Sequence, residues 1–419
     1  MDASRRAIRR RALVVGTMVA TSVSGVACGL VLGVDDVPPV PSRAGGRDSG
    51  HEARMGVMDA GPERGVDGAY DRDVLDVTGE PEVLVGQLPM RSGGPTTSAA
   101  EINFAVRDLW LGETDQTPAF TLDGNAWATF GYNIDGKVTD SLSTDVCTLA
   151  PGALSTVQVD GNDGADNSFG ANLVDEFSIA FGGSLSSYLS SKVAMGSFTF
   201  LFDLTGLTTS PTQTNTGLTA EIFGGARFPG TPTFTLADNW PIDPGTLADG
   251  VTLSHGAKTS FSDSYVANGT WVSGSPTDIV FALELANKPL VLKFHQAVAT
   301  FQHSLDDAGA HHARHGRIAG ILKADELITA ITSVVGDINK GQYCGLVRAF
   351  AAKVTASQDI LEDGTNAEGL ACSGISFGVA FEGDEIQPPS VVAPARLIDA
   401  SAPPCPSDAG DAGDGRAAP

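Results

Sequence analysis

Acidic and amide side chains gather in one short loop, Asp160-Gly161-Asn162-Asp163-Gly164-Ala165-Asp166. Calcium prefers about six to eight hard oxygen ligands, and a tight loop supplies them when Asp and Asn alternate with Gly. The loop lacks the closing Glu of an EF-hand, so it is not one of these. We predict a structural Ca²⁺ site here, with the alternative that the segment is a solvated turn without metal. The predicted ligands are Asp160, Asn162, Asp163 and Asp166.

A second segment is crowded with histidines, namely His303, His311, His312 and His315. Imidazole nitrogens bind zinc and nickel, so a metal site could be drawn from these side chains. The sequence has no His-Glu-x-x-His motif, however, and Ala308-Gly309-Ala310 indicates a loop. We therefore interpret the segment as a solvated loop rather than a metal centre.

Signatures of catalysis are weak. The segment Gly182-Gly183-Ser184-Leu185-Ser186 lacks the closing Gly of a nucleophile elbow, and neither a Walker nor a Rossmann glycine pattern precedes a helix. Glycoside cleavage needs two carboxyl groups, and any β protein this acidic offers many. The candidates are Glu176, Asp203, Glu221 and Glu284. We predict no catalytic residue and keep a glycan-directed hydrolase as an alternative.

Aromatic side chains could line a sugar-binding platform or fill the core. The residues concerned are Trp110, Trp127, Trp240, Trp271, Tyr132 and Tyr265. We favour positions in the core or at strand edges, and keep the sugar platform as the alternative.

The elements that would hold these residues are mainly β-strands. Apolar residues alternate with a period of two, as in Phe177–Phe181 and Phe198–Leu204, which is typical of half-buried strands. The Asn268-Gly269 pair predicts a tight hairpin. Helical spacing then predicts helices near 324–335 and 342–361. We predict a mainly β domain over residues 99–388, sandwich-like or jelly-roll-like, with the two helices packed on it.

Four cysteines of this domain and its tail could form disulfides, because none is spaced as Cys-x-x-Cys and the chain is expected to be exported. We favour a bond between Cys344 and Cys372, which would join the second helix to the last strand. Cys147 would then pair with Cys405 and tie the tail to the core.

The N-terminus predicts export. Residues 1–27 contain five Arg and one Asp, followed by a short apolar stretch with small residues at its end, as in a signal peptide. The start Ser4-Arg5-Arg6 resembles a twin-arginine signal, and an ordinary Sec signal is the alternative. Cys28 follows Val26-Ala27 as in a lipoprotein box, so we predict that Cys28 is acylated; plain cleavage after Ala27 is the alternative.

Two low-complexity segments flank the domain. Residues 28–98 are rich in Pro, Gly, Asp and Arg and predict a disordered tether, and residues 389–419 predict a low-complexity acidic tail. The formal net charge of −24 and the sequence pI near 4.5 exclude nucleic acid as an expected partner, because phosphate binding needs clustered cations.

Several segments resemble a group of uncharacterised secreted lipoproteins from Gram-negative soil bacteria. They are Cys28–Asp36, the Asp-Ala-Gly tail, Leu109–Asp115, Ala126–Gly136, Asp160–Gly170 and Cys372–Gly378. The resemblance implies an extracytoplasmic address at the outer membrane or cell surface. It implies no activity.

We therefore predict an exported, lipid-anchored binding or adhesion protein of the cell surface, stabilised by calcium. Its membrane contact would be the lipid anchor, and its ligand an extracellular glycan or protein. The alternatives are a glycan-directed hydrolase on a jelly-roll fold and a structural envelope protein without a small-molecule ligand. A periplasmic or secreted location is the alternative to the cell surface.

Overall fold

The structure is a computed structural model that describes residues 86–95, 98, 100–181, 183–285, 288–339 and 344–395. Within these ranges, the structure describes only the backbone of residues 179–181, 284–285, 288–289, 335–339 and 344–346. The predicted signal peptide, Cys28, most of the tether, Cys405 and the end of the tail lie outside the described residues. The described residues belong to one compact unit.

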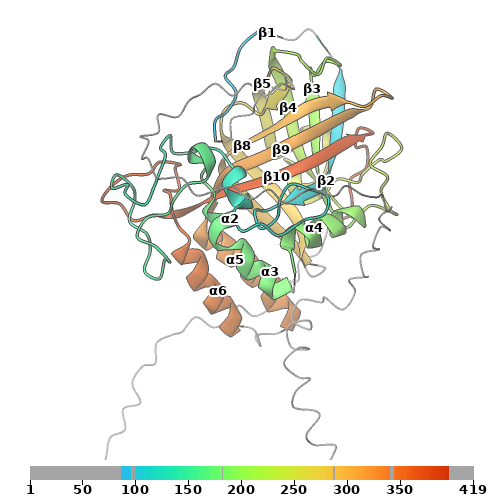
Figure 1. The fold of residues 1–419 in the computed structure, drawn as a ribbon. Helices are drawn as coiled ribbons and strands as arrows, with labels where there is room; N and C mark the ends of the chain where they lie inside the picture. Colours follow the sequence, from blue (N-terminus) through green and yellow to red (C-terminus); the bar gives the residue numbers. More distant parts are fainter. Residues whose placement is uncertain are drawn as a thin grey trace, which may run out of the picture. The chain divides into compact units, whose positions relative to one another are not determined.

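Ten strands form one hydrogen-bonded sheet in this part of the chain (Figure 1). Their bounds are β1 (Gly94–Pro95), β2 (Glu101–Trp110), β3 (Thr199–Thr205), β4 (Asn215–Gly225), β5 (Thr259–Ala267), β6 (Thr270–Val272), β7 (Thr277–Leu285), β8 (Lys288–Leu305), β9 (His311–Lys323) and β10 (Gly374–Ile386). Their order is β1-β4-β3-β2-β10-β9-β8-β6-β5, and β7 pairs with β8 beside this path. The prediction of a mainly β domain is confirmed.

The sheet closes on itself because β5 also pairs with β4. The strands from β4 round to β5 therefore form a ring of antiparallel neighbours, and β1 adds a short parallel edge to β4. Opposite walls touch: the Phe104 ring of β2 lies 5.3 Å from that of Phe301 of β8, and Phe202 of β3 lies 6.2 Å from Phe301. Side chains thus fill the ring, as expected for so small a closed sheet.

Turns and bulges shape this ring. Asn268 and Gly269 both have positive φ, 48° and 80°, and join β5 to β6 as the predicted hairpin. Gln296 of β8 and His315 of β9 also have positive φ, 48° each, and stand where the strand register shifts. An extra residue at a bulge bends a strand and increases its twist, which helps a sheet to close.

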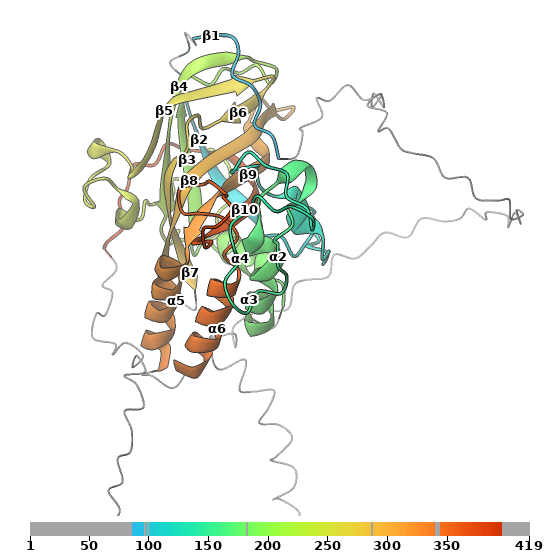
Figure 2. The same ribbon diagram turned by 90° about the vertical axis from the view of Figure 1, so that its left-hand side faces the viewer.

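Five α-helices are described. They are α2 (Ser168–Asn172), α3 (Val174–Phe181), α4 (Leu185–Ala194), α5 (Ala324–Asn339) and α6 (Cys344–Ala356). The helices predicted near 324–335 and 342–361 are confirmed as α5 and α6, and Leu327, Ile331 and Val334 of α5 are buried as their spacing predicts. Figures 1 and 2 show α3, α5 and α6 together at one end of the sheet.

The prediction of a strand over Phe177–Phe181 is wrong, because these residues form the second half of α3. An alternating run of five residues is too short to separate a strand from a helix. The decisive signals lie outside the run: Asp175 and Glu176 occupy the first helical turn, where carboxylates are favourable. Ser184 then caps α4 by accepting a hydrogen bond from the Ser187 N–H.

Candidate functional site

An apolar cavity of about 80 Å³ lies between the sheet and the helices. Strands β2, β3 and β7–β10 supply one side, and helices α2–α5 supply the other. Every lining residue is apolar: Leu109, Leu111, Phe169, Phe177, Leu185, Leu189, Phe200, Phe281, Leu283, Leu290, Leu292, Phe294, Ile318, Leu327, Ile331, Phe377 and Val379. Three of these residues, Phe177, Leu283 and Leu292, are only half-buried.

Serine side chains hold α4 against β2 and so fix one wall of the cavity. The Ser190 hydroxyl accepts from the Leu109 N–H at 2.9 Å and donates to the Leu109 carbonyl at 3.1 Å. The Ser186 hydroxyl accepts from the Leu111 N–H at 2.9 Å. Strand β3 pairs with β2 only as far as Ala105. Beyond that point, the serine hydroxyls bind backbone N–H and carbonyl groups that a neighbouring strand would otherwise bind.

Glu113 completes this attachment at the start of α4. It is 4% exposed, and one carboxylate oxygen accepts from the Ser186 N–H at 2.6 Å and the Ser184 hydroxyl at 2.9 Å. The other oxygen accepts from the Ser186 hydroxyl at 2.8 Å. A carboxylate is favourable here because the N-terminus of a helix carries unpaired N–H groups and a partial positive charge.

The predicted calcium ligands separate into two pairs. Asp160 and Asp166 turn inward: an oxygen of Asp160 accepts from the Thr139 N–H at 2.6 Å, and one of Asp166 accepts from the Ile134 N–H at 2.6 Å. Asn162 and Asp163 are exposed. The structure therefore brings two of the four predicted ligands together, while the other two face solvent.

Two further carboxyl groups, Asp135 and Asp359, face this pair and were missed from the sequence. Burial raises the pKa of Asp166 well above its usual value, and the charges of Asp135, Asp160 and Asp359 raise it further. Burial likewise raises the pKa of Asp160 to about 7, with Asp135 adding to the effect. Asp135 stands in an Asp-Gly pair typical of a turn, and no sequence pattern marks Asp359.

No three His, Cys, Asp or Glu side chains in the described ranges are arranged to hold a metal ion. The calcium site therefore stays a prediction. Of its four predicted ligands, Asn162 and Asp163 are exposed, Asp160 is half-buried and Asp166 is buried.

The interpretation of the histidine segment as a solvated loop is wrong for His303 and His311. These side chains are 3% and 8% exposed, their rings stack with centroids 5.0 Å apart, and His303 Nε2 lies 2.7 Å from His311 Nδ1. Strands β8 and β9 carry them, because the chain turns between the two strands rather than through the whole segment. Burial, reinforced by the neighbouring His311, lowers the pKa of His303 to about 4.

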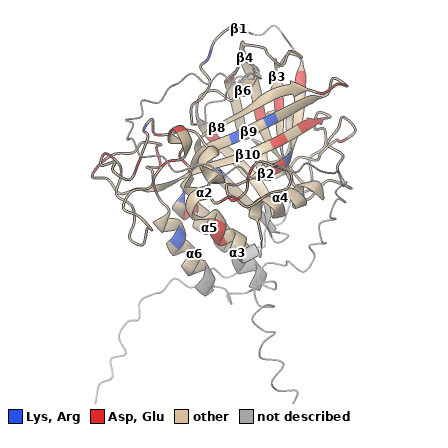
Figure 3. Ribbon diagram, in the orientation of Figure 1, with Lys and Arg blue, Asp and Glu red and all other residues tan. Residues whose placement is uncertain are grey.

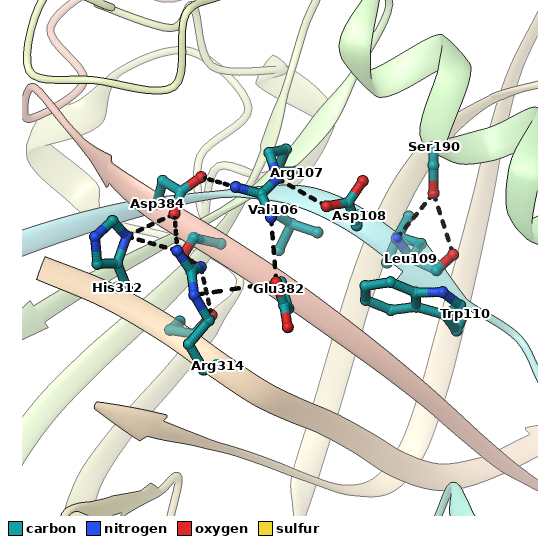
Figure 4. A network of polar contacts seen from close by, with 12 residues as sticks. Val106, Arg107, Asp108, Leu109, Trp110, Ser190, His312, Arg314, Glu382 and Asp384 are labelled. Atoms are coloured by element: carbon teal, nitrogen blue, oxygen red, sulfur yellow. Dashed lines mark hydrogen bonds and ion pairs between the residues drawn. The ribbon is translucent and has the colours of Figure 1, made fainter. Parts of the chain in front are cut away.

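His312 belongs to a separate ionic network on β2, β9 and β10 (Figure 4). The Asp384 carboxylate pairs with Arg107 at 2.6 Å, with Arg314 at 2.7 Å and with His312 at 2.7 Å. Burial alone would raise the pKa of Asp384, but the two guanidinium groups outweigh it and hold the pKa below its usual value. Both charges of each pair are supplied by the chain, so the network needs no ligand.

Among the candidate carboxyl pairs, the structure brings Asp203 and Glu221 together. They are direct cross-strand neighbours on β3 and β4 and line a polar groove of about 270 Å³ with Thr205, Thr219 and Ser260. Burial and the carboxylates of Glu101 and Glu221 raise the pKa of Asp203 to about 7. By contrast, Glu176 forms an ion pair with Lys353, and Glu284 lies among the residues whose side chains are not described.

The tryptophans do not form an exposed platform. Trp110, Trp240 and Trp271 are at most 1% exposed, and Trp127 is half-buried in a short 3₁₀ turn. Tyr132 and Tyr265 are 3% and 8% exposed. The expectation of positions in the core or at strand edges is confirmed for these side chains except Trp127.

The predicted disulfide pairing is wrong, because Cys372 is bonded to Cys147 and not to Cys344. The two Cα atoms lie 5.2 Å apart across a sequence separation of 225 residues. Strand-like pairing of Thr148 with Ala371 brings the two cysteines together, and this contact between distant loops has no signature in the sequence. Cys405, the expected partner of Cys147, lies outside the described residues.

Comparisons with protein-family models, curated proteins and solved structures found no match. In the part of the chain that the structure describes, no helix is long and apolar enough to cross a membrane.

Proposed function

We propose that this chain is an exported, lipid-anchored binding protein that holds an apolar ligand, a short unbranched acyl chain, in the cavity between the sheet and helices α2–α5. The observation that carries the proposal is the lining, which is apolar throughout. A sugar needs polar partners in its site, and this cavity offers none. The binding role predicted from the sequence is thus kept, and the expected glycan is replaced by an apolar ligand.

Energetics favour an occupant. An empty cavity costs about 24 cal/mol per Å³, so a void of 80 Å³ costs about 2 kcal/mol. Each buried methylene contributes about 0.8 kcal/mol to binding. Cavities of about 150 Å³ admit benzene, and this cavity has about half that volume. Even a short acyl chain therefore requires the lining to move apart, and the half-buried Phe177, Leu283 and Leu292 are the lining residues with most room to do so.

The charges around the cavity are consistent with a ligand whose buried part is uncharged. Figure 3 shows that acidic residues occur on strands and loops and that basic residues are fewer. A carboxylate head group would therefore remain in solvent at the rim while the hydrocarbon enters. The proposal includes a lipid anchor at Cys28, which the signal-like N-terminus supports. It also includes a sandwich-like packing of the two walls of the ring, which the contacts of Phe104 and Phe202 with Phe301 support.

Titration calorimetry with decanoic acid tests the proposal. We expect saturable binding with a negative heat-capacity change, because apolar surface is buried. Leu189→Trp, which fills the cavity from α4, should weaken binding at least about tenfold. Leu142→Trp is the matched control, because Leu142 is 84% exposed and remote from the lining. Equal binding by both variants, or none by the unchanged protein, would refute the proposal.

A second candidate function rests on Asp203 and Glu221. Two carboxyls on neighbouring strands, one with its pKa raised to about 7, resemble the acid and the nucleophile of a glycoside hydrolase. Release of reducing sugar from bacterial or plant polysaccharides, abolished in both Asp203→Asn and Glu221→Gln, would support this candidate. Activity that survives either substitution would exclude it.

A further inference from the structure

Two inward-facing carboxyl groups, Asp160 and Asp166, lie where the 132–139 and 160–166 segments pack together. Backbone hydrogen bonds fix the two segments: the Asp160 N–H donates to the Thr139 carbonyl at 3.0 Å, and the Asp166 N–H donates to the Tyr132 carbonyl at 3.1 Å. Asp166 is 3% exposed. The titratable groups that face it are further carboxyls, Asp135, Asp160 and Asp359, which repel one another when they are ionised.

A second observation points to a ligand for this cluster. Three buried oxygen atoms of the facing segment have no hydrogen-bond partner: Asn133 Oδ1, Asp135 Oδ2 and Thr139 Oγ1. Thr139 is only 4% exposed, its N–H binds the Asp160 carboxylate, and its hydroxyl lies beside the same carboxyl. Unpaired buried polar atoms are costly, and all three of these are oxygens, the kind of atom that calcium binds.

We propose that Asp160 and Asp166, together with the side-chain oxygens of Asn133, Asp135 and Thr139, bind a calcium ion. Calcium accepts carboxylate, amide and hydroxyl oxygens in a flexible coordination sphere, whereas magnesium requires stricter geometry and zinc prefers nitrogen and sulfur. The exposed Asn162 and Asp163 are not ligands. Three carboxyls do not converge in the structure as it stands, because carboxylates repel one another until a cation lies between them.

The ion would be structural. Asn167, directly after Asp166, accepts from the Gly170 N–H to cap α2 and exchanges two hydrogen bonds with Gly378 of β10. Calcium at Asp166 would therefore hold the 132–139 loop, the start of α2 and the outer face of β10 in one arrangement. This inference is independent of the apolar cavity.

Equilibrium dialysis of the full chain against ⁴⁵Ca²⁺ measures binding directly, without a variant. We expect about one ion per chain, and thermal unfolding in saturating calcium about 5 °C above that in chelator. Asp160→Asn and Asp166→Asn should lose the calcium response while unfolding in chelator at the same temperature as the unchanged protein, or higher, because each removes a buried charge. Asp163→Ala is the matched control and should keep the full response.

Two results would overturn the inference. The first is no bound calcium in dialysis of the unchanged protein. The second is a calcium response that disappears in Asp163→Ala but persists in Asp160→Asn and Asp166→Asn, which would place the ion in the exposed turn.

Discussion

At the scale of single residues, environment decides chemistry more than residue type does. His303 and His315 look equivalent in the sequence, yet one is buried against His311 and the other is exposed in a bulge. Asp160 and Asp163 likewise belong to one acidic loop but face opposite ways. The sequence shows which residues could act; which of them meet depends on contacts between distant segments.

Because of His303, we predict that acid lowers the free energy of unfolding. Its pKa in the folded protein is about 4, below the value near 6.5 of an unfolded chain, so the unfolded state binds more protons between these pH values. The stabilising effect is complete above about pH 6.5 and is lost as the pH falls towards 4, by about 3 kcal/mol. Urea unfolding at pH 7 and pH 4.5 should show a smaller pH dependence for His303→Gln than for the unchanged protein.

The control for this experiment is His315→Asn, because the His315 side chain is exposed and Asn tolerates the positive φ of this position. It should leave the pH dependence of the unfolding free energy unchanged. If His303→Gln and His315→Asn behave alike, the buried histidine pair is not the source of acid sensitivity.

At the scale of elements, the sequence predicts the helices and turns that have a clear residue pattern. It misses those whose position depends on contacts with distant segments. Helices α5 and α6 and the β5–β6 hairpin follow from helical spacing and from Asn268-Gly269. Helices α2 to α4 are short and carry Ser and Gly, so their spacing is ambiguous, and their attachment through Ser186 and Ser190 is visible only in the fold. The ring closes through the pairing of β4 with β5, which depends on bulges that no residue type predicts.

Glu113 should control the docking of α4. Glu113→Ala removes a buried carboxylate that accepts three hydrogen bonds from Ser184 and Ser186. We expect a loss of about 2–3 kcal/mol in the free energy of unfolding, measured with urea, because buried donors are left unpaired. Glu368→Ala, at an exposed position, should change stability by less than about 0.5 kcal/mol. A loss as small for Glu113→Ala would mean that α4 is held by its apolar contacts alone.

At the scale of the whole molecule, a long segment between β2 and α2 lies over the sheet and returns to it near β10. Thr148 pairs with Ala371, and the Cys147 N–H donates to the Asn366 side chain at 2.6 Å. The composition of the sequence predicts a β-rich exported domain, but not which distant loops meet. Cysteine spacing alone does not fix the disulfide pairing, and the predicted bond between Cys344 and Cys372 is wrong because a contact between two loops joins Cys147 to Cys372.

The Cys147–Cys372 bond therefore predicts a large effect of reduction. A disulfide stabilises by restricting the unfolded chain, and a loop of 225 residues is long, so we expect Cys147→Ser to cost about 2–5 kcal/mol in unfolding free energy. Cys344→Ser is the matched control and should keep the bond and the stability. Peptide mapping of the unreduced protein should recover Cys147 joined to Cys372. A peptide joining Cys344 to Cys372 would instead tie α6 to β10 and free the long segment from the sheet.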